Sequence, residues 1–367
     1  ETEKQIPEIA KGDIVIDAIF GTGLTRSAEG IAASVIQAIN KSGAEVYSVD
    51  IPSGLFCDKS NAPKVAVIHS TKTFTFHSPK LSFLFPENAI YVPAYEVLDI
   101  DVMEEYGEQI HSPYYYITAD FVHPRVKKRA KFSHKGNYWH AFIWAGSYGK
   151  MGAAVLAVKA ALKSGAGLIT ANVPPCGYEI MQYTNPEAMV EVSVNQNYLD
   201  PTPVLEKYSA NGVGCGIGID KVTKAYLKKL LSVYKKPVVI DADALNILAA
   251  DNKLLSSVPE SSILTPHPGE FKRLAGEWKN DSDKLKMQIA FSAKYKVMVV
   301  LKGALTTITT PGAKIYFNST GNAGMAKGGS GDVLTGLITS LLAQGYTSEY
   351  AAIIGVYVHG LAGDFAK

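Results

Sequence analysis

Cysteine is scarce in this sequence, and long apolar runs are absent. The three cysteines among the 367 residues, Cys57, Cys176 and Cys215, are widely spaced and have no CxxC or histidine-rich partner. This pattern indicates neither a disulfide framework nor a zinc site, so the cytoplasm is the expected compartment. No uninterrupted run of about 18 apolar residues occurs and the first residues show no signal-peptide pattern, so we expect no membrane partner.

Charge of one sign is not in excess either. The chain has 36 basic and 34 acidic residues, and 47% of its residues are hydrophobic. The charge balance excludes a general affinity for nucleic acid, and the hydrophobic content excludes a disordered chain. Small molecules or nucleotides bound at local sites are the expected ligands.

The length of 367 residues is too great for one ordinary core and suits two domains. The chain opens on a short charged stretch and closes inside a helical pattern that has no stop signal. We therefore expect a fragment of a longer protein.

The first part of the chain predicts one βαβ unit. A strand over residues 13–20 is followed by a glycine turn, a helix over 31–43 and a second strand over 44–50. Since the two strands run parallel, the turns "GTGLTR" and "DIPSG" emerge at the same sheet edge, where open α/β folds bind ligands. Asp17, the residues from Gly21 to Ser27, Asp50 and Ser53 should face one crevice.

These turns differ in how strongly they indicate function. "GTG" alone also fits a purely structural tight turn, because the full GxGxxG spacing is missing. Asp50 stands directly at a strand's carboxyl end before a Pro-Ser-Gly turn, a placement that favours contact with a ligand.

The character of the sequence changes near Glu105 to Pro113, where we place a domain boundary. The basic run "RVKKRAKFSHK" that follows predicts a solvated linker face, with a phosphate-binding arm as the alternative. Aromatic residues do not interleave with this run as a nucleic-acid platform would require.

The second half of the chain predicts a mostly parallel α/β sandwich. The pattern indicates strands over 139–146, 168–173, 237–246, 262–271 and 297–303, a helix over 152–167, a hairpin over 306–319 and a helix after "GMAKGGSGD". Five strand ends carry polar clusters: "AGSYGKMG", "DADALN", "TPHPGE", "KGALT" and "GGSGD". Carboxyl ends of parallel strands share one edge, so the five clusters should converge on one cleft.

Each cluster taken alone also has a structural interpretation. His267 between two prolines could be a rigid turn residue, Lys302 a strand-end cap and Asn246 a helix cap. Asp332 could simply be an acid in the first turn of a helix, where the helix dipole favours it.

Taken together, the clusters suit phosphoryl transfer. Lys302 supplies positive charge to a phosphate, Glu270 and either Asp241 or Asp243 can hold magnesium through water, and the backbone N–H groups of 328–331 can receive phosphoryl oxygens. Asp332 can then accept the proton of an attacking hydroxyl. GxxxxGK[ST] matches nowhere, so the nucleotide must be held without a P-loop.

Several motifs resemble a known family. "SHKGNYWHAFIWAGSYGKMG", "VVIDADALN", "LTPHPGEF", "VLKGALT" and "GNAGMAKGGSGDVLTGLI" resemble the ribokinase-like ADP/ATP-dependent NAD(P)H-hydrate dehydratase family, and "VIDAIFGTGLTR", "VDIPSGL" and "TFTFHSPK" resemble the NAD(P)H-hydrate epimerase domain fused in front of it in bacteria. The resemblance implies a partial Rossmann-like epimerase domain over 1–108, a linker and start of the second domain over 109–135, and a ribokinase-like dehydratase domain over 136–367.

The resemblance implies repair of NADHX and NADPHX, the hydrated nicotinamide cofactors. The first domain would interconvert their R and S epimers, and the second would dehydrate the S form with ADP or ATP as co-substrate and magnesium and potassium as ions. Phosphorylating the ring hydroxyl would turn it into a leaving group that the ring nitrogen expels. We also expect a homo-oligomer.

The resemblance also assigns roles to residues. Catalysis falls on Asp332 and Asp50, and potassium ligation on Asp17 and Ser53. Substrate contacts fall on Ala145, Gly146, His267 and Asp332 in the second domain and on Gly21, Thr22, Gly23, Leu24, Thr25, Arg26, Ser27 and Asp50 in the first. Nucleotide contacts fall on Lys302, Gly303, Ala304, Leu305, Thr306, Gly328, Gly329, Ser330 and Gly331, with Glu270 the magnesium candidate through water.

Two departures and two alternatives remain. The family's NNGGDG-type loop would precede the first strand seen here, and "GVGCGIGID" differs from the family's usual GPGLG. One alternative function is a vitamin-precursor or sugar kinase with a non-catalytic scaffold domain, since the same anion site and base would serve it. The other is a binding module, because epimerase-like domains also serve as interaction scaffolds.

Overall fold

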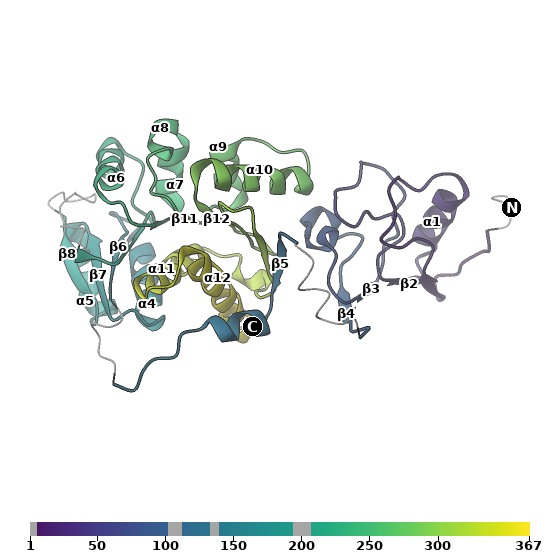
Figure 1. Ribbon diagram of the computed structural model, residues 1–367, viewed down its shortest axis with the longest axis horizontal. Coiled ribbons are helices and arrows are strands. Elements are labelled where there is room, and N and C mark those ends of the chain that lie inside the picture. The colour runs from purple at the N-terminus through teal and green to yellow at the C-terminus, as the bar shows by residue number, and fades with distance from the viewer. Residues whose placement is uncertain (1–5, 102–111, 133–138, 194–206) are drawn as a thin grey trace. The chain divides into compact units, whose positions relative to one another are not determined.

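The computed structural model describes residues 6–101, 112–132, 139–193 and 207–367 (Figure 1). The chain divides into two compact units, one of Glu1–Ser112 with Trp278–Leu285, the other of Pro113–Glu277 with Lys286–Lys367. Most of the boundary predicted near residues 105–113 lies outside the described residues. Among the described helices, none is long and apolar enough to cross a membrane.

Unit 1 contains a parallel sheet in the order β1-β2-β3-β4. Its strands are β1 Ile14–Asp17, β2 Glu45–Val49, β3 Lys72–Phe76 and β4 Tyr95–Leu98. The helix α1, Gly30–Ser42, connects β1 to β2 and buries Ile36 and Ile39 against Val46 and Ile68. The predicted βαβ unit is confirmed, and the carboxyl ends of β1 and β2 do share one edge.

Unit 2 contains a ten-stranded sheet in the order β5-β14-β13-β12-β11-β10-β9-β6-β7-β8. The strands are β5 Tyr114–Ile117, β6 His140–Trp144, β7 Leu168–Val173, β8 Met189–Val192, β9 Ala210–Val213, β10 Val238–Ile240, β11 Ile263–Leu264, β12 Met298–Leu301, β13 Thr307–Thr309 and β14 Ile315–Asn318. Among the described strands only β13 runs antiparallel to its neighbours. The strand order reverses between β6 and β9, and such a reversal is where open α/β sheets form ligand crevices.

Helices cover both faces of this sheet (Figure 1). Helices α4, α11 and α12 lie on one face, and α6, α7, α9 and α10 on the other. The helices are α3 Ala119–Val122, α4 Met151–Lys163, α5 Tyr178–Thr184, α6 Lys221–Val233, α7 Ala242–Ala249, α8 Asn252–Leu255, α9 Pro268–Ala275, α10 Asp281–Tyr295, α11 Ser330–Ala343 and α12 Ser348–Phe365. The α/β sandwich predicted from the sequence is confirmed.

Helix α11 lies almost backbone to backbone on α4. A Cβ added to Gly336 would stand 1.9 Å from the carbonyl oxygen of Ala157. Only glycine fits this crossing. The close contact with α4 therefore fixes the distance of α11, which begins in the phosphate motif "GMAKGGSGD", from the sheet.

Two predicted strands are shorter than expected. The strand predicted over 237–246 ends at Ile240, because Asp241 is the N-cap residue of helix α7. The strand predicted over 262–271 ends at Leu264, because Pro268 occupies the first turn of α9 and His267 with Glu270 forms its capping box. Both polar clusters therefore lie at helix N-termini on the carboxyl edge of the sheet.

Candidate functional site

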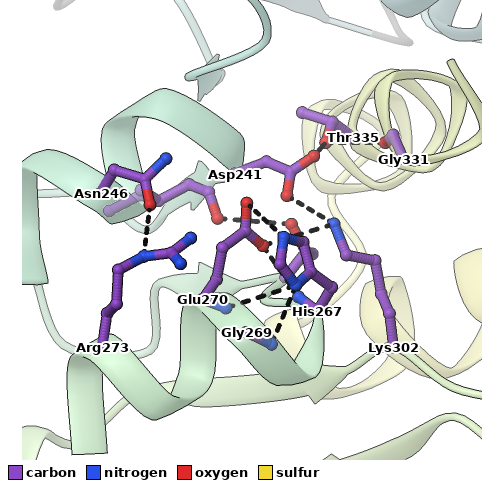
Figure 2. Close-up of polar contacts among 11 residues, drawn as sticks. Asp241, Asn246, His267, Gly269, Glu270, Arg273, Lys302, Gly331 and Thr335 are labelled. Carbon is purple, nitrogen blue, oxygen red and sulfur yellow. Dashed lines mark hydrogen bonds and ion pairs between the residues drawn. The ribbon is translucent and has the colours of Figure 1, made fainter. Parts of the chain in front are cut away.

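The centre of the unit 2 site is an ion pair between Lys302, which follows β12, and Asp241, which follows β10 (Figure 2). The ammonium nitrogen lies 2.9 Å from Oδ1 of Asp241, while Oδ2 accepts a 2.8 Å hydrogen bond from the Thr335 hydroxyl on α11. Asp241 is 1% exposed. Burial opposes the charge of Lys302, but the carboxylates of Asp241 and Glu270 outweigh burial and raise the pKa of the lysine. The lysine is therefore a fixed cation.

Glu270 both caps the start of α9 and contacts Lys302 (Figure 2). Its Oε2 accepts the His267 backbone N–H at 2.8 Å and lies 3.9 Å from the Lys302 ammonium. The His267 ring accepts hydrogen bonds at Nδ1 from the Gly269 and Glu270 N–H groups, which leaves Nε2 3.5 Å from Oε1 of Glu270. His267 is therefore a helix cap whose half-exposed ring also lines the cleft described below.

The structural alternative for Asn246 is wrong. This residue lies inside α7, where its Oδ1 accepts a 3.0 Å hydrogen bond from Nε of Arg273 on α9 (Figure 2). The bond joins the two helices that carry Asp241 and Glu270 and so helps fix their spacing.

Asp332 lies in the first turn of α11, close to Asp241 of this network, and is partly buried. The Cys215 Sγ and one carboxylate oxygen each of Asp241 and Asp332 all lie within 4.8 Å of one another. Burial raises the pKa of Asp332, the neighbouring Asp241 charge adds to this, and hydrogen bonding to Cys215 and the charge of Lys302 oppose it. A carboxylate with a raised pKa is a stronger base than an ordinary aspartate.

The glycines before Asp332 differ in backbone conformation and in the space around them. Gly329 caps α11 at a φ of 93°, and a Cβ there would come 2.5 Å from Leu156. Gly328 has no positive φ, and a Cβ there would meet nothing within 4 Å. Gly303 likewise has no positive φ, and a Cβ there would meet nothing within 4 Å. The fold requires Gly329, whereas Gly328 and Gly303 leave open space for a ligand.

A cleft of about 920 Å³ opens at this motif. It is lined by Lys302, Gly303, Ala304, Thr306, Gly328, Ser330 and Gly331 among the predicted nucleotide residues, but not by Leu305 or Gly329. A Cβ on Gly331 would lie 3.3 Å from the Lys302 ammonium, so this glycine brings the start of α11 against the cation. The volume suits a nucleotide.

The other wall of the cleft was missed from the sequence. It includes residues 320–323 and 325–327, and Val356, His359 and Gly360 on α12. Burial lowers the pKa of His359, whose Nε2 lies 3.4 Å from the Ser330 hydroxyl. The polar stretch "NSTGN" before the phosphate motif was the available signal for the loop, while α12 offered none beyond a histidine in an apolar helix.

The predicted substrate residues Ala145 and Gly146 lie at the strand-order reversal, not in the cleft lining. Gly146 donates its N–H to the Cys215 carbonyl at 2.8 Å, and the Ser147 hydroxyl donates to the Gly216 carbonyl at 2.7 Å. Through Cys215, this turn connects to Asp332. Residues from "TPHPGE", "KGALT" and "GGSGD" line the cleft, whereas none from "AGSYGKMG" or "DADALN" does. The five polar clusters lie at one edge of the sheet, but the prediction that all five converge on one cleft is confirmed for three of them only.

The described part of the basic run does not line the cleft. The Lys127 ammonium donates to the Gly345 carbonyl at 2.7 Å, and Arg129 donates to the Gly165 carbonyl. Arg125 lies over the rings of Phe121 and Tyr350. These contacts do not support the phosphate-binding arm.

In unit 1, Asp17 and Ser53 are buried and bonded to each other. Both the backbone N–H and the hydroxyl of Ser53 donate to the Asp17 carboxylate, which also accepts the Ser48 hydroxyl at 2.9 Å. The Ser53 oxygen accepts the Phe20 N–H at 2.9 Å. This bonding joins the turn after β1 to the turn after β2.

Asp50 lies beyond β2 in the left-handed conformation, with a φ of 63°. Its Oδ1 contacts the Lys80 ammonium at 2.8 Å and the Phe76 N–H at 3.0 Å. Burial raises the pKa of Asp50, but the hydrogen bonds from Lys80 and Phe76 outweigh it and hold the pKa below its usual value. Lys80 was not predicted, although "HSPK" follows β3 at the same edge.

The loop from Gly21 to Ser27 is mostly exposed. Gly21 and Gly23 have no positive φ, and a Cβ on either would meet nothing within 4 Å. Backbone strain and close packing therefore do not explain these glycines, and their contact with a substrate stays a prediction.

The fold and site of unit 2 define a ribokinase-like phosphoryl-transfer class: a mostly parallel α/β sheet, and a helix that is capped by glycine and carries an acid in its first turn. The solved structure of a ribokinase-like superfamily protein from Enterococcus faecalis is 28% identical, with a TM-score of 0.60, over 70% of this chain and 89% of that one. The ADP/ATP-dependent NAD(P)H-hydrate dehydratase of Bacillus subtilis, co-crystallised with ATP and Mg²⁺, is 28% identical with a TM-score of 0.58 over 68% of this chain and 89% of that one.

The chain belongs to the NAD(P)H-hydrate dehydratase family, whose model matches residues 141–367. The model of the YjeF-related protein N-terminus matches residues 1–82. The bifunctional NAD(P)H-hydrate repair enzyme Nnr of Moorella thermoacetica is 39% identical over 365 residues, 96% of this chain and 68% of the relative. The ADP-dependent (S)-NAD(P)H-hydrate dehydratase of Neisseria meningitidis is 40% identical over 249 residues, 66% of this chain and 81% of the relative.

Proposed function

We propose that this chain repairs hydrated nicotinamide cofactors, with unit 2 dehydrating (S)-NADHX and (S)-NADPHX at the expense of ADP or ATP. The names of the relatives support this activity. The observation that carries the proposal is the position of Asp332 in the first turn of α11, beside the Lys302 and Asp241 ion pair and directly after Ser330 and Gly331, which line a cleft of nucleotide size.

The chemistry starts with transfer of a phosphoryl group to the ring hydroxyl of the hydrate. Asp332 accepts the hydroxyl proton, and its raised pKa suits that task. Lys302 and the N–H groups at the start of α11 stabilise the charge on the migrating phosphoryl oxygens. The ring nitrogen then expels phosphate and restores the dihydronicotinamide. Most of the catalysis is positioning and charge stabilisation.

Magnesium fits next to Glu270. This residue is buried and presents carboxylate oxygens beside Lys302, and such oxygens are the ligands that magnesium prefers. Glu270 would hold the ion through water, and the ion would supply positive charge to the nucleotide phosphates. Asp241 is less suited, since its two oxygens have protein partners at 2.9 Å and 2.8 Å, whereas Oε1 of Glu270 lies 3.5 Å from Nε2 of His267.

We also propose that unit 1 interconverts the R and S epimers. Asp50 would act as the base, because its lowered pKa keeps it ionised at neutral pH. Lys80 would keep the carboxylate in place, and residues 21–27 would contact the substrate. The donor set of Asp17, Ser48 and Ser53, one carboxylate and two hydroxyls, suits potassium, which would share these oxygens and hold the two turns together.

The dehydratase proposal is tested by mixing the protein with hydrated NADH and either ADP or ATP, and following the return of dihydronicotinamide absorbance. Recovery of absorbance only with nucleotide supports the proposal. A product that stays phosphorylated would identify a small-molecule kinase instead.

The epimerase proposal is tested with Asp50→Ala. This variant should fail to convert the R epimer and should dehydrate the S epimer at the wild-type rate. Loss of both activities would indicate a folding defect and remove support for the role of Asp50. A cytoplasmic location and a homo-oligomeric state stay predictions.

A further inference from the structure

Cys215 lies in a turn that is fixed on two sides. It follows β9 between Gly214, with a φ of 132°, and Gly216, with a φ of 66°. A Cβ on Gly214 would stand 1.8 Å from the Asp241 carbonyl oxygen, so the turn lies directly against the backbone of Asp241. On the other side the Cys215 carbonyl accepts the Gly146 N–H at 2.8 Å. These two contacts fix the position of the thiol, and Cys215 is only 1% exposed.

The thiol lies close to two carboxylates. Its Sγ lies within 4.8 Å of a carboxylate oxygen of Asp241 and of Asp332. Burial raises the pKa of Cys215 well above its usual value, and the two carboxylates add to this, so the group remains S–H. A thiol has one hydrogen to donate.

Asp332 is the better acceptor for that hydrogen. The two oxygens of Asp241 already contact the Lys302 ammonium and the Thr335 hydroxyl. Asp332 has hydrogen bonding to Cys215 among the causes that lower its pKa. Because Lys302 already supplies a cation to this cluster, the arrangement favours hydrogen bonding over metal ligation.

We infer that Cys215 is a positioning residue for the catalytic base: its S–H holds one oxygen of Asp332, so that the other oxygen faces the substrate hydroxyl. The inference rests on the proposed dehydratase function. Cys215 does not touch the reacting atoms in this arrangement. It acts by fixing the rotamer of Asp332 and by favouring its ionised form.

The test compares Cys215→Ala, Cys215→Ser and the matched control Cys176→Ala, which removes a half-buried thiol elsewhere. Dehydration of the S epimer with saturating ADP or ATP is measured between pH 5 and pH 9. In Cys215→Ala we expect kcat to fall by about three- to tenfold, since one weak charge-assisted hydrogen bond is lost. The KM for the nucleotide should stay unchanged, because the thiol contacts only the base.

The pH profile separates positioning from packing. Asp332 is faced by Cys215, Asp241, Asp243 and Lys302, and of these only the thiol changes in the variant. Its loss should move the acid limb of kcat to higher pH. A serine hydroxyl donates the same hydrogen, so Cys215→Ser should restore both kcat and the acid limb, and Cys176→Ala should match the wild type.

Wild-type kcat and an unshifted acid limb in folded Cys215→Ala would overturn the inference. If the alanine variant does not fold, Cys215→Ser decides: wild-type behaviour supports a donor role, and a loss as large as tenfold contradicts it. A wild-type protein that restores no dihydronicotinamide with either nucleotide would instead remove the proposed function on which the inference rests.

Discussion

The ammonium of Lys80 lies 2.8 Å from Oδ1 of Asp50, and only 13% of the lysine side chain and 19% of the aspartate side chain is exposed. Lys80 also donates to the Phe76 carbonyl at 3.1 Å, so the lysine is tied to the end of β3. Oδ2 of Asp50 has no partner among the described residues. The carboxylate is thus held by one oxygen and presents the other.

Lys80→Met should raise the pKa of Asp50. Burial, the largest influence on this carboxyl, raises its pKa, and the substitution removes the lysine hydrogen bond and charge that lower it. The base form would be lost over a higher pH range, so the acid limb of R-to-S conversion should move upward. Epimer interconversion followed chromatographically as a function of pH checks this. Lys80→Arg keeps the charge and should stay closer to the wild type, and equal profiles for both variants would contradict the role of the charge.

Asp332→Asn should lower turnover of the S epimer by about two to four orders of magnitude with nucleotide affinity nearly intact, because only the proton acceptor is removed. Near-normal turnover would refute the assignment of Asp332 as the base.

The same variant should be more stable than the wild type at neutral pH. The folded pKa of Asp332 lies above its usual value of 3.8, so the folded state loses stability as the pH rises from that value through the folded pKa. Asparagine cannot ionise and avoids this loss. Thermal melting at several pH values measures the effect, and a lower melting temperature for the variant at neutral pH would contradict the electrostatic argument.

Gly328→Ala should affect the ligand and not the fold. A Cβ there meets nothing within 4 Å and the φ is ordinary, so the stability should change by no more than about 0.5 kcal/mol. The methyl group would occupy the phosphate end of the cleft and raise the KM for the nucleotide on the order of tenfold. Gly12→Ala, which also meets nothing within 4 Å, is the control. An unchanged KM would show that phosphate does not approach Gly328.

A fragment that begins at Pro113 should fold and dehydrate the S epimer without unit 1, since about 250 residues bury enough core to stand alone. This fragment keeps β5 and the hydrogen bond from the Ile315 N–H to the Pro113 carbonyl. A second fragment that begins at Ala119 lacks β5 and should be less stable. Circular dichroism and turnover measure both properties, and a folded but inactive longer fragment would show that unit 1 completes the dehydratase site.

Local sequence patterns were enough for several elements. The strand predicted over 168–173 has the same bounds as β7, and the hairpin predicted over 306–319 contains the antiparallel pair β13 and β14. Apolar runs bounded by turn residues carry this information. The rule that parallel strands share one carboxyl edge then brought the polar clusters together.

Contacts between distant residues could not be predicted in the same way. Lys302 and Asp241 are 61 residues apart, and nothing local to either says that they pair. The start of α9 was misread for a different reason. The sequence contains the proline and the capping residues of α9, and these signals, not the apolar residues before them, decide where the strand ends.

Strand β5 is the first strand of unit 2 to be synthesised, and its neighbour in the sheet is β14. Ile117 at the end of β5 accepts a hydrogen bond from the Ser319 hydroxyl, 202 residues later. At a synthesis rate of about 5–20 residues per second, roughly ten to forty seconds separate the emergence of the two strands from the ribosome. The tyrosine-rich strand β5 has no β14 to pair with during that interval. This edge of the sheet can form only once β14 has emerged, shortly before the glycine-rich motif that follows it in the sequence.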